Sequence, residues 1–180
     1  MWARNTLDSA AVIFDYACMK SQQKHPKKYW LMKSEPDVFS IDHLQKDKTT
    51  LWEGVRNYQA RNFMTTDMSI GDEILFYHSN AEPPGVAGTA TVSSKPLPDA
   101  LQFNKKSEYY DAKAFPEKPI WFCVEVKFKM KFKQFISLET LKSDPNCKDM
   151  MVIKRGQRLS IQPVSEIDFN YLVAKGIGSC

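Results

Sequence analysis

Apolar residues form one strictly alternating run and several compact runs along the chain. From Val124 to Phe132 (VEVKFKMKF), apolar residues alternate with Glu or Lys, which predicts a half-buried antiparallel strand. The run YWLMK (Tyr29–Lys33) is apolar throughout and predicts a buried strand. SIGDEILFYHS predicts a turn at Gly71 and Asp72 followed by a strand, and PPGVAGTATVSS predicts another turn and strand. We expect these last two strands to pair antiparallel, joined by a loop over residues 80–85.

Short helices are expected between the strands. Each of three segments follows a serine that can cap a helix: Ser40 before IDHLQKD, Ser137 before LETLK and Ser165 before EIDFNYLVAK. Ser165 and Asp168 have the spacing of a capping box, and Gly176 is expected to end that helix. Between Asn57 and Thr66, Ala60, Phe63 and Met64 have the spacing of an apolar helical stripe.

The order of these elements predicts the fold class. TTLW and RLSIQPV are further strand-like segments, and no alternation of strands with long helices is present. KPLPDALQFNKKSEYYDAKAFPEKP lacks periodicity and is expected to be a long, mostly surface connection. We therefore predict an α+β domain built on a small, twisted sheet that can close on itself.

Composition narrows the function classes. The chain has 180 residues, which predicts one domain, and no apolar run approaches the ~20 residues needed to span a bilayer. The apolar run AAVIF is shorter than a signal-peptide core, so export is not expected. The four cysteines form no C-x-x-C pair and are interpreted as free thiols in a reducing compartment. No metal site or cofactor is predicted, because the three histidines are scattered.

The first residues differ from the rest of the chain. Residues 1–18 precede Met19, and Met19 is followed by the polar, basic run KSQQKHPKK. Such a run often precedes the first ordered strand as a solvated tail. We interpret residues 1–27 as an N-terminal extension, with Met19 as an alternative start, and residues 28–176 as the domain.

Net charge, a lysine repeat and a neighbouring His-Ser pair could each indicate a function. A net charge of +4 permits binding to a polyanion but does not establish it. The lysine ladder at positions 127, 129, 131 and 133 is either a phosphate-tracking stripe or the solvated face of a strand, and the solvated face is favoured. His78 and Ser79 are adjacent on a strand and should point to opposite faces, which disfavours a catalytic pair.

The stretch WEGVRNYQARNF (Trp52–Phe63) is rich in planar and hydrogen-bonding groups. Aromatic rings stack on nucleobases, Asn reads a base edge and Arg holds phosphate, so the set suits a planar polar ligand. The alternative is that Trp52 and Tyr58 belong to the core and the remaining residues to the surface. Composition alone does not decide between the two.

Several blocks of this sequence, in this order, resemble the EVE domain family. They are YWLMKSEPDVFSIDHL, LWEGVRNYQARNFM, GDEILFYHSN, PGVAGTATV, YYDAKAFPEKPIWFCVEVKF, ISLETLK and KRGQRLSIQPVSEIDF, and they cover residues 29–172. The resemblance implies a PUA-like mixed β pseudo-barrel with peripheral short helices. It also implies a non-enzymatic, monomeric reader of a modified base in nucleic acid, with modified cytosine in DNA favoured. We expect a cytoplasmic protein in bacteria and a nuclear one in eukaryotes.

The resemblance places a base pocket at the strand ends. The residues expected to line it are Ser34, Trp52, Asn57, Tyr58, His78, Ser79, Ser160 and Gln162, and the expected phosphate-binding rim is Lys33, Arg56, Arg61 and Arg158. For Ser160 and Gln162, backbone capping at a strand end is an equal alternative. Two other functions stay open: a small-molecule sensor using the same pocket, and an RNA-binding or RNA-processing protein. RNA processing would need a His or Lys beside the pocket, and His78 is the first candidate.

Overall fold

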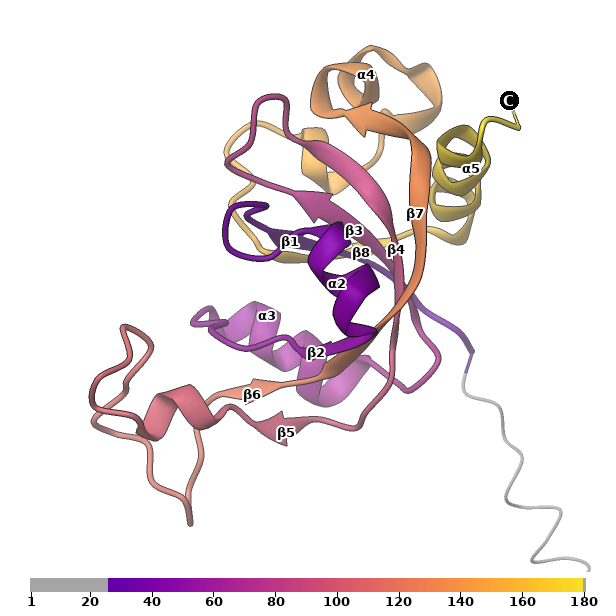
Figure 1. Cartoon of the computed structure of the whole chain (residues 1–180). Helices are drawn as coiled ribbons and strands as arrows, with labels where there is room; N and C mark the ends of the chain where they lie inside the picture. Colours follow the sequence, from indigo (N-terminus) through magenta and orange to yellow (C-terminus); the bar gives the residue numbers. More distant parts are fainter. Residues whose placement is uncertain (1–25, 180) are drawn as a thin grey trace, which may run out of the picture.

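The computed structural model of the chain describes residues 26–179, and its centre is a six-stranded mixed sheet (Figure 1). The strand order is β2-β7-β4-β3-β1-β8, with β1 and β3 parallel and the other neighbours antiparallel. The bounds are β1 Tyr29–Ser34, β2 Thr49–Leu51, β3 Glu73–His78, β4 Gly85–Val92, β7 Glu125–Ser137 and β8 Ile161–Val164. The sheet curls into a half-barrel, so the predicted α+β, PUA-like fold is confirmed.

Short helices surround the sheet. They are α2 (Ile41–Asp47), α3 (Tyr58–Asn62) continued by a π-helical turn (η2, Phe63–Asp67), α4 (Leu138–Ser143) and α5 (Glu166–Ile177), together with the 3₁₀ turns η3 (Ala100–Phe103), η4 (Pro145–Cys147) and η5 (Met151–Ile153). The predicted caps are confirmed: the hydroxyls of Ser40, Ser137 and Ser165 each accept a backbone N–H in the first turn. Each cap satisfies a donor that a helix start otherwise leaves unpaired.

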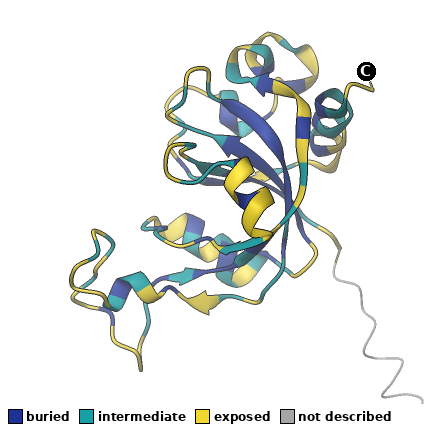
Figure 2. Ribbon diagram, viewed as in Figure 1, coloured by how far each residue is buried: buried dark blue, intermediate teal, exposed yellow. Residues whose placement is uncertain are grey.

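The sheet is buried on both faces, which explains the uninterrupted apolar runs of β1 and β3. Trp30 and Met32 belong to one apolar cluster, which includes residues of α2 and α3, whereas Leu31 belongs to a second cluster with residues of α4 and α5. Successive strand residues point to opposite faces, so one strand supplies both clusters. Figure 2 shows the resulting concentration of buried residues in the central strands.

A buried carboxylate, Asp72, fixes the start of the parallel pair. It accepts hydrogen bonds from the backbone N–H groups of Lys28 and Ser69, each at 3.0 Å, and from Trp30 Nε1 at 3.0 Å. Because β1 and β3 start together and run in register, Ser34 and His78 end side by side. The Ser79 N–H then donates to the Ser34 carbonyl at 2.8 Å, which holds the two strand ends together.

The alternating run forms β7, which is longer than predicted. Lys127, Lys129, Lys131 and Lys133 are exposed, as the favoured interpretation required, and two of these side chains form ion pairs. Lys129 Nζ lies 2.7 Å from Glu73 Oε1, and Lys131 Nζ lies 2.6 Å from Asp42 Oδ1. β2 covers the outer edge of β7 only at residues 125–127.

The long connection forms a lobe, residues 95–123, that projects from the main sheet (Figure 1). Most of its residues are exposed, as predicted, but it has an interior of its own. The strands β5 (Leu97–Pro98) and β6 (Phe122–Cys123) pair within it. Gln102, fully buried, donates to the carbonyls of Asp99 and Trp121 and accepts from the N–H groups of Ile120 and Trp121. This saturated amide orders a segment that has no sequence periodicity.

The structure describes two of the four cysteines and only the last residues of the expected N-terminal extension. Cys123 and Cys147 are free and buried, and burial raises the pKa of these thiols to about 12 and about 11. Cys18, Cys180, Met19 and most of the expected N-terminal extension lie outside residues 26–179. Within that range, no helix combines the length and apolar character needed to cross a bilayer.

The predicted role of Gly176 is wrong. Helix α5 continues to Ile177 and ends at Gly178, whose φ of +79° is the left-handed conformation that glycine adopts readily. Gly176 is instead buried against β7, where a Cβ would overlap the ring of Phe132. Its missing side chain lets α5 approach the sheet closely.

Gly176→Ala should therefore destabilise the protein. Alanine favours a helix by ~1 kcal/mol over glycine, but overpacking a core contact costs about 1–3 kcal/mol. We expect a net loss in the free energy of unfolding, measured by urea denaturation. Asn170→Ala, at an exposed position of the same helix, is the control. Stabilisation by Gly176→Ala would show that the Phe132 ring moves aside freely.

Candidate functional site

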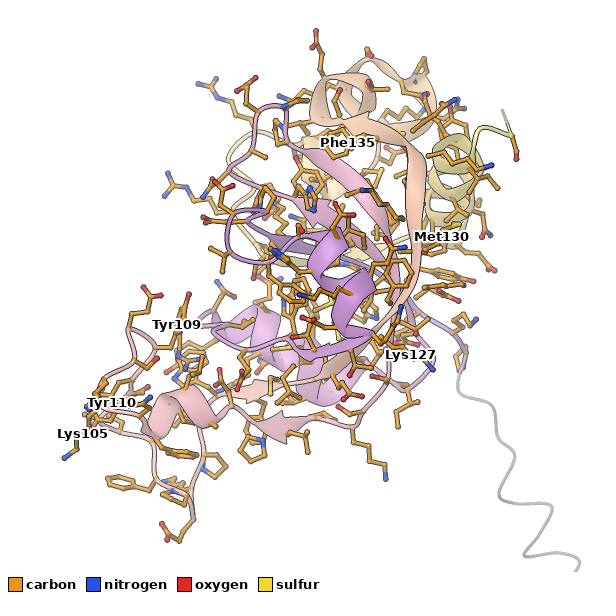
Figure 3. The ribbon with its side chains drawn as sticks, viewed as in Figure 1. Lys105, Tyr109, Tyr110, Lys127, Met130 and Phe135 are labelled. Carbon is orange, nitrogen blue, oxygen red and sulfur yellow. The ribbon has the colours of Figure 1, made fainter. Side chains whose placement is uncertain are left out.

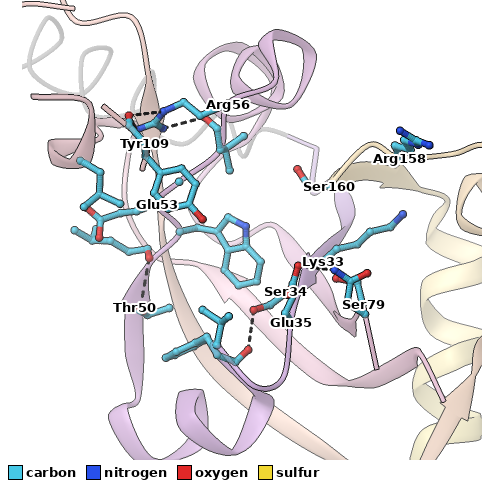
Figure 4. Close-up of a pocket in the computed structure, with 18 of the residues that line it drawn as sticks. Lys33, Ser34, Glu35, Thr50, Glu53, Arg56, Ser79, Tyr109, Arg158 and Ser160 are labelled. Carbon is cyan, nitrogen blue, oxygen red and sulfur yellow. Dashed lines mark hydrogen bonds between the residues drawn. The ribbon is translucent and has the colours of Figure 1, made fainter. Parts of the chain in front are cut away.

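A cleft of about 810 Å³ opens where β1 and β3 end (Figure 4). Five segments form it, and three of them lie on the side of the main sheet. Those three contribute Lys33, Ser34, Glu35, Val38 and Phe39 after β1, Ser79 and Asn80 after β3, and Gln157, Arg158 and Ser160 before β8. The segment from Thr50 to Arg56 and two lobe residues, Leu101 and Tyr109, complete it.

Trp52 occupies a position between core and cleft. Its side chain lines the cleft, although the residue is only 8% exposed and belongs to the first apolar cluster. The indole meets the Phe76 ring edge-on, with centroids 5.5 Å apart, and the Trp52 backbone N–H donates to the Val124 carbonyl at 2.8 Å. The backbone bond fixes the segment, and burial against Phe76 restricts the indole. Trp52 is therefore a core residue that also borders the cleft, and its contact with a ligand stays a prediction.

Tyr109 enters the cleft from the lobe and rests on the Trp52 segment. A Cβ at Gly54 would lie 3.0 Å from the Tyr109 ring, so only glycine leaves room for the ring at this distance. Gly54 also has a φ of +78°, which disfavours other residues. Arg56 holds the same tyrosine by its backbone, because Nε and Nη2 donate to the Tyr109 carbonyl at 2.9 and 2.6 Å (Figure 4).

Arg56 is therefore a structural residue of the cleft rather than part of its rim. Its Nη1 donates to Asp99 Oδ2 at 2.7 Å, and Asp99 has no solvent exposure. The same carboxylate accepts from the N–H groups of Gly54 at 2.9 Å and Leu101 at 2.8 Å. Most of the guanidinium donors are taken by these contacts, which join the lobe to the segment after β2 and leave Arg56 few donors for a phosphate.

The serines and Lys33 lie where the resemblance implied. Ser34, Ser79 and Ser160 line the cleft together with Lys33. The Ser34 hydroxyl donates to the Phe39 carbonyl at 2.7 Å, which leaves its oxygen able to accept. Lys33 Nζ donates to the Gln157 carbonyl at 3.2 Å, and burial lowers the pKa of this lysine. Arg158 is exposed and lines the cleft, and its contact with phosphate stays a prediction.

Asn57, Tyr58 and Arg61 do not line the cleft. Asn57 caps α3, and its Oδ1 accepts from the N–H groups of Gln59 at 2.9 Å and Ala60 at 3.1 Å. The helix that starts there turns Tyr58 outward, where it is 59% exposed and stacks on Trp121 with centroids 4.8 Å apart.

Arg61 covers the Tyr58 ring and donates to the Ile120 carbonyl at 3.2 Å. Tyr109, and not Tyr58, lines the cleft with Trp52.

His78 and Gln162 also have other partners. His78 Nε2 accepts the Ile41 N–H at 3.1 Å, so the imidazole positions the start of α2. Burial lowers the pKa of His78, while Asp42 raises it and Lys131 lowers it further. Gln162 is buried in β8 and donates to the Leu159 carbonyl at 2.8 Å. The sequence predicted that Ser160 and Gln162 point to the same face of an extended strand. This prediction is wrong, because Ser160 lies in a bend before β8.

The sequence missed several residues of the cleft. Glu35 and Asn80 face it from neighbouring turns, and Asn80 Nδ2 donates to Glu35 Oε1 at 2.6 Å. Glu53 lines it as well, and burial, followed by Asp99, raises the pKa of its carboxyl group. Burial, Glu108 and Glu35 raise the pKa of Tyr109. Asn80 has a φ of +48°, a conformation that Asn tolerates, but the sequence alone does not reveal it.

A basic groove continues from the cleft. It has a volume of about 570 Å³ and shares Lys33, Ser79, Asn80, Gln157 and Arg158 with the cleft. Its further lining includes Lys142, Lys154 and Arg155, all exposed. Clustered cations on one path favour an extended polyanion over a small neutral ligand.

A family model described as the EVE domain matches residues 28–175. The chain belongs to the EVE domain family. Human thymocyte nuclear protein 1 is 40% identical over 176 residues, which cover 87% of this chain and 76% of the human protein. A solved hypothetical protein from Leishmania major has a TM-score of 0.79 at 47% identity, covering 83% of this chain and 94% of that one.

A second solved EVE relative carries information about a ligand. It is the human THYN1 protein in complex with DNA containing 5-methylcytosine. Its TM-score is 0.77 at 40% identity, and the match covers 83% of this chain and 98% of that chain. The predicted family is therefore confirmed.

Arg56→Met should strongly destabilise this EVE domain. Removing one partner leaves the Asp99 charge buried without its cation, which typically costs 3–5 kcal/mol. Chemical denaturation followed by tryptophan fluorescence measures the change. Arg155→Met, at an exposed position, should stay within about 0.5 kcal/mol of the natural chain. A similarly small effect at Arg56 would contradict its structural role.

Stability should fall as the pH drops below about 6.5, in part through His78. Because the folded pKa of His78 is lowered, the unfolded chain takes up a proton first, so this contribution is present above pH 6.5 and is lost toward acid. His78→Asn should show a shallower loss of unfolding free energy between pH 7 and 5. Equal slopes for the two proteins would contradict the buried, neutral imidazole. His43→Asn, at an exposed position, is the control.

Proposed function

We propose that this EVE domain is a non-enzymatic reader of modified bases in DNA, with modified cytosine as its ligand. The base leaves its stack and enters the cleft between Trp52 and Tyr109. The observation that carries the proposal is a rigid aromatic cleft whose open side continues into a basic groove. The complex of the human THYN1 protein with 5-methylcytosine DNA supports the same class of ligand.

The cleft has the size and chemistry of a base site. Its volume of about 810 Å³ lies within the ~300–1,000 Å³ of ligand pockets. Trp52 and Tyr109 supply aromatic surface, and Ser34, Ser160 and Glu35 supply hydrogen-bonding groups. The Trp52 indole packs on Phe76, and the Tyr109 ring lies against Gly54 and under the Arg56 guanidinium, so little side-chain freedom is lost on binding.

Binding energies indicate why the groove matters. Stacking on aromatic residues contributes roughly 1–3 kcal/mol per base. Extruding a base from a duplex costs a few kcal/mol, so stacking and extrusion nearly cancel. Phosphate contacts by Lys154, Arg155 and Arg158 must then supply the net affinity. One buried methyl group adds only ~0.8 kcal/mol, so selectivity for 5-methylcytosine through the methyl group alone is modest.

The geometry favours this function over a nuclease that uses His78. Turnover was expected to need a His or Lys beside the pocket, with His78 as the first candidate. The His78 imidazole accepts the Ile41 N–H and does not line the cleft, whereas Lys33 does line it and donates to the Gln157 carbonyl. The small-molecule alternative leaves the basic groove without a role.

Tyr109→Ala should weaken binding to a 5-methylcytosine oligonucleotide by about 5- to 150-fold, the loss of one stacking contact. Fluorescence anisotropy with a labelled single strand measures the affinity. Tyr110→Ala is a matched control, because Tyr110 is exposed at the lobe surface and does not line the cleft (Figure 3). It should bind as the natural chain does.

Two results would contradict the proposal. One is equal binding of cytosine and 5-methylcytosine strands by the natural chain at every salt concentration. The other is affinity that hardly changes with salt, since neutralised phosphates give a slope of about −0.7 per contact for single strands. The second result favours the small-molecule sensor.

A further inference from the structure

We propose that Glu35, fixed by Asn80, reads the amino group of the bound base and selects cytosine-type over thymine-type bases. This inference rests on the proposed function and assigns the edge contact within the same cleft. Glu35 is therefore a specificity-determining residue of the cleft.

The position of the Glu35 carboxylate is set by two turns. Glu35 directly follows β1, and Asn80 follows β3, whose end lies beside that of β1. Asn80 Nδ2 donates to Glu35 Oε1 at 2.6 Å. Among residues 26–179, no side-chain or backbone donor is bonded to Glu35 Oε2, which leaves this oxygen available to a ligand.

The surroundings place this pair at the base. Glu35 and Asn80 line the same cleft as Trp52 and Tyr109, and the charge of Glu35 raises the pKa of Tyr109 along with burial and Glu108. Glu53 is the other carboxylate of the cleft. It has no side-chain hydrogen bond to another described residue, so its orientation is less fixed than that of Glu35.

The chemistry of the pair matches one class of base edge. A carboxylate only accepts hydrogen bonds, whereas the neighbouring amide nitrogen donates. Cytosine presents an N4 amino donor beside the N3 acceptor, the complementary order. Thymine presents the O4 acceptor beside an N3–H donor, so its O4 would face the carboxylate. Two acceptors would then face each other without a proton between them. This costs thymine more binding free energy than the loss of a methyl contact would.

The test compares 5-methylcytosine with thymine, because both bases carry the same 5-methyl group and differ only at this edge. Each is placed at one position of otherwise identical single strands, which removes the cost of base extrusion. The natural chain should prefer 5-methylcytosine by at least about fivefold. In Glu35→Gln, whose amide can also donate, the ratio of the affinities for the 5-methylcytosine and thymine strands should fall to about twofold or less.

Controls separate the edge contact from general charge effects. Asp37→Asn removes one charge from the same turn but does not line the cleft, so it should keep the natural ratio. Thermal melting checks that each variant folds. If Glu35→Gln fails to fold, Asn80→Asp tests the same pair, because it removes the amide donor and should also lower the ratio.

The outcomes separate the role of Glu35 from the reader function on which it rests. An unchanged ratio in folded Glu35→Gln and Asn80→Asp would overturn the role of Glu35 while leaving the reader function intact. A ratio lost in Glu53→Gln but kept in Glu35→Gln would overturn it as well. Failure of the natural chain to prefer 5-methylcytosine over unmodified cytosine would instead overturn the proposed function.

Discussion

The buried carboxylate of Asp99 determines how the cleft is built. A charge without solvent contact requires a cation and hydrogen-bond donors, and here these come from Arg56, Gly54 and Leu101. The planar guanidinium of Arg56 also grips the Tyr109 carbonyl. One electrostatic requirement of the interior thus brings together the wall formed by Trp52 and the wall formed by Tyr109.

The sheet separates the groups that stabilise the fold from those that can bind a ligand. Its central strands supply apolar side chains to both faces, so their middles are fully occupied. Polar side chains are free to face a ligand only where the strands end, at Ser34 and in the turns that follow. The parallel pairing of β1 and β3 brings two such ends to the same place. A base would accordingly bind at the edge of the core without disturbing it.

Local patterns in the sequence predicted the fold well, because periodicity and capping are properties of neighbouring residues. The strand at Val124–Phe132 and the caps at Ser40 and Ser165 are examples. The cleft was predicted only in part. Tyr58 is close to Trp52 in sequence, but the helix capped by Asn57 turns it away. Tyr109 lies in a segment without periodicity, and contacts with Gly54 and with Arg56, 53 residues away, place it.

The projecting lobe gives the cleft a wall that is anchored at few points. Its tip, residues 104–118, is largely exposed, while its attachment depends on the interior contacts of Asp99 and Gln102 and on the grip of Arg56 on Tyr109. Changes at exposed positions of the tip leave these anchoring contacts intact. The width of the cleft is then free to change over evolution, so that one scaffold can be adapted to bases of different size by alteration of a single surface segment.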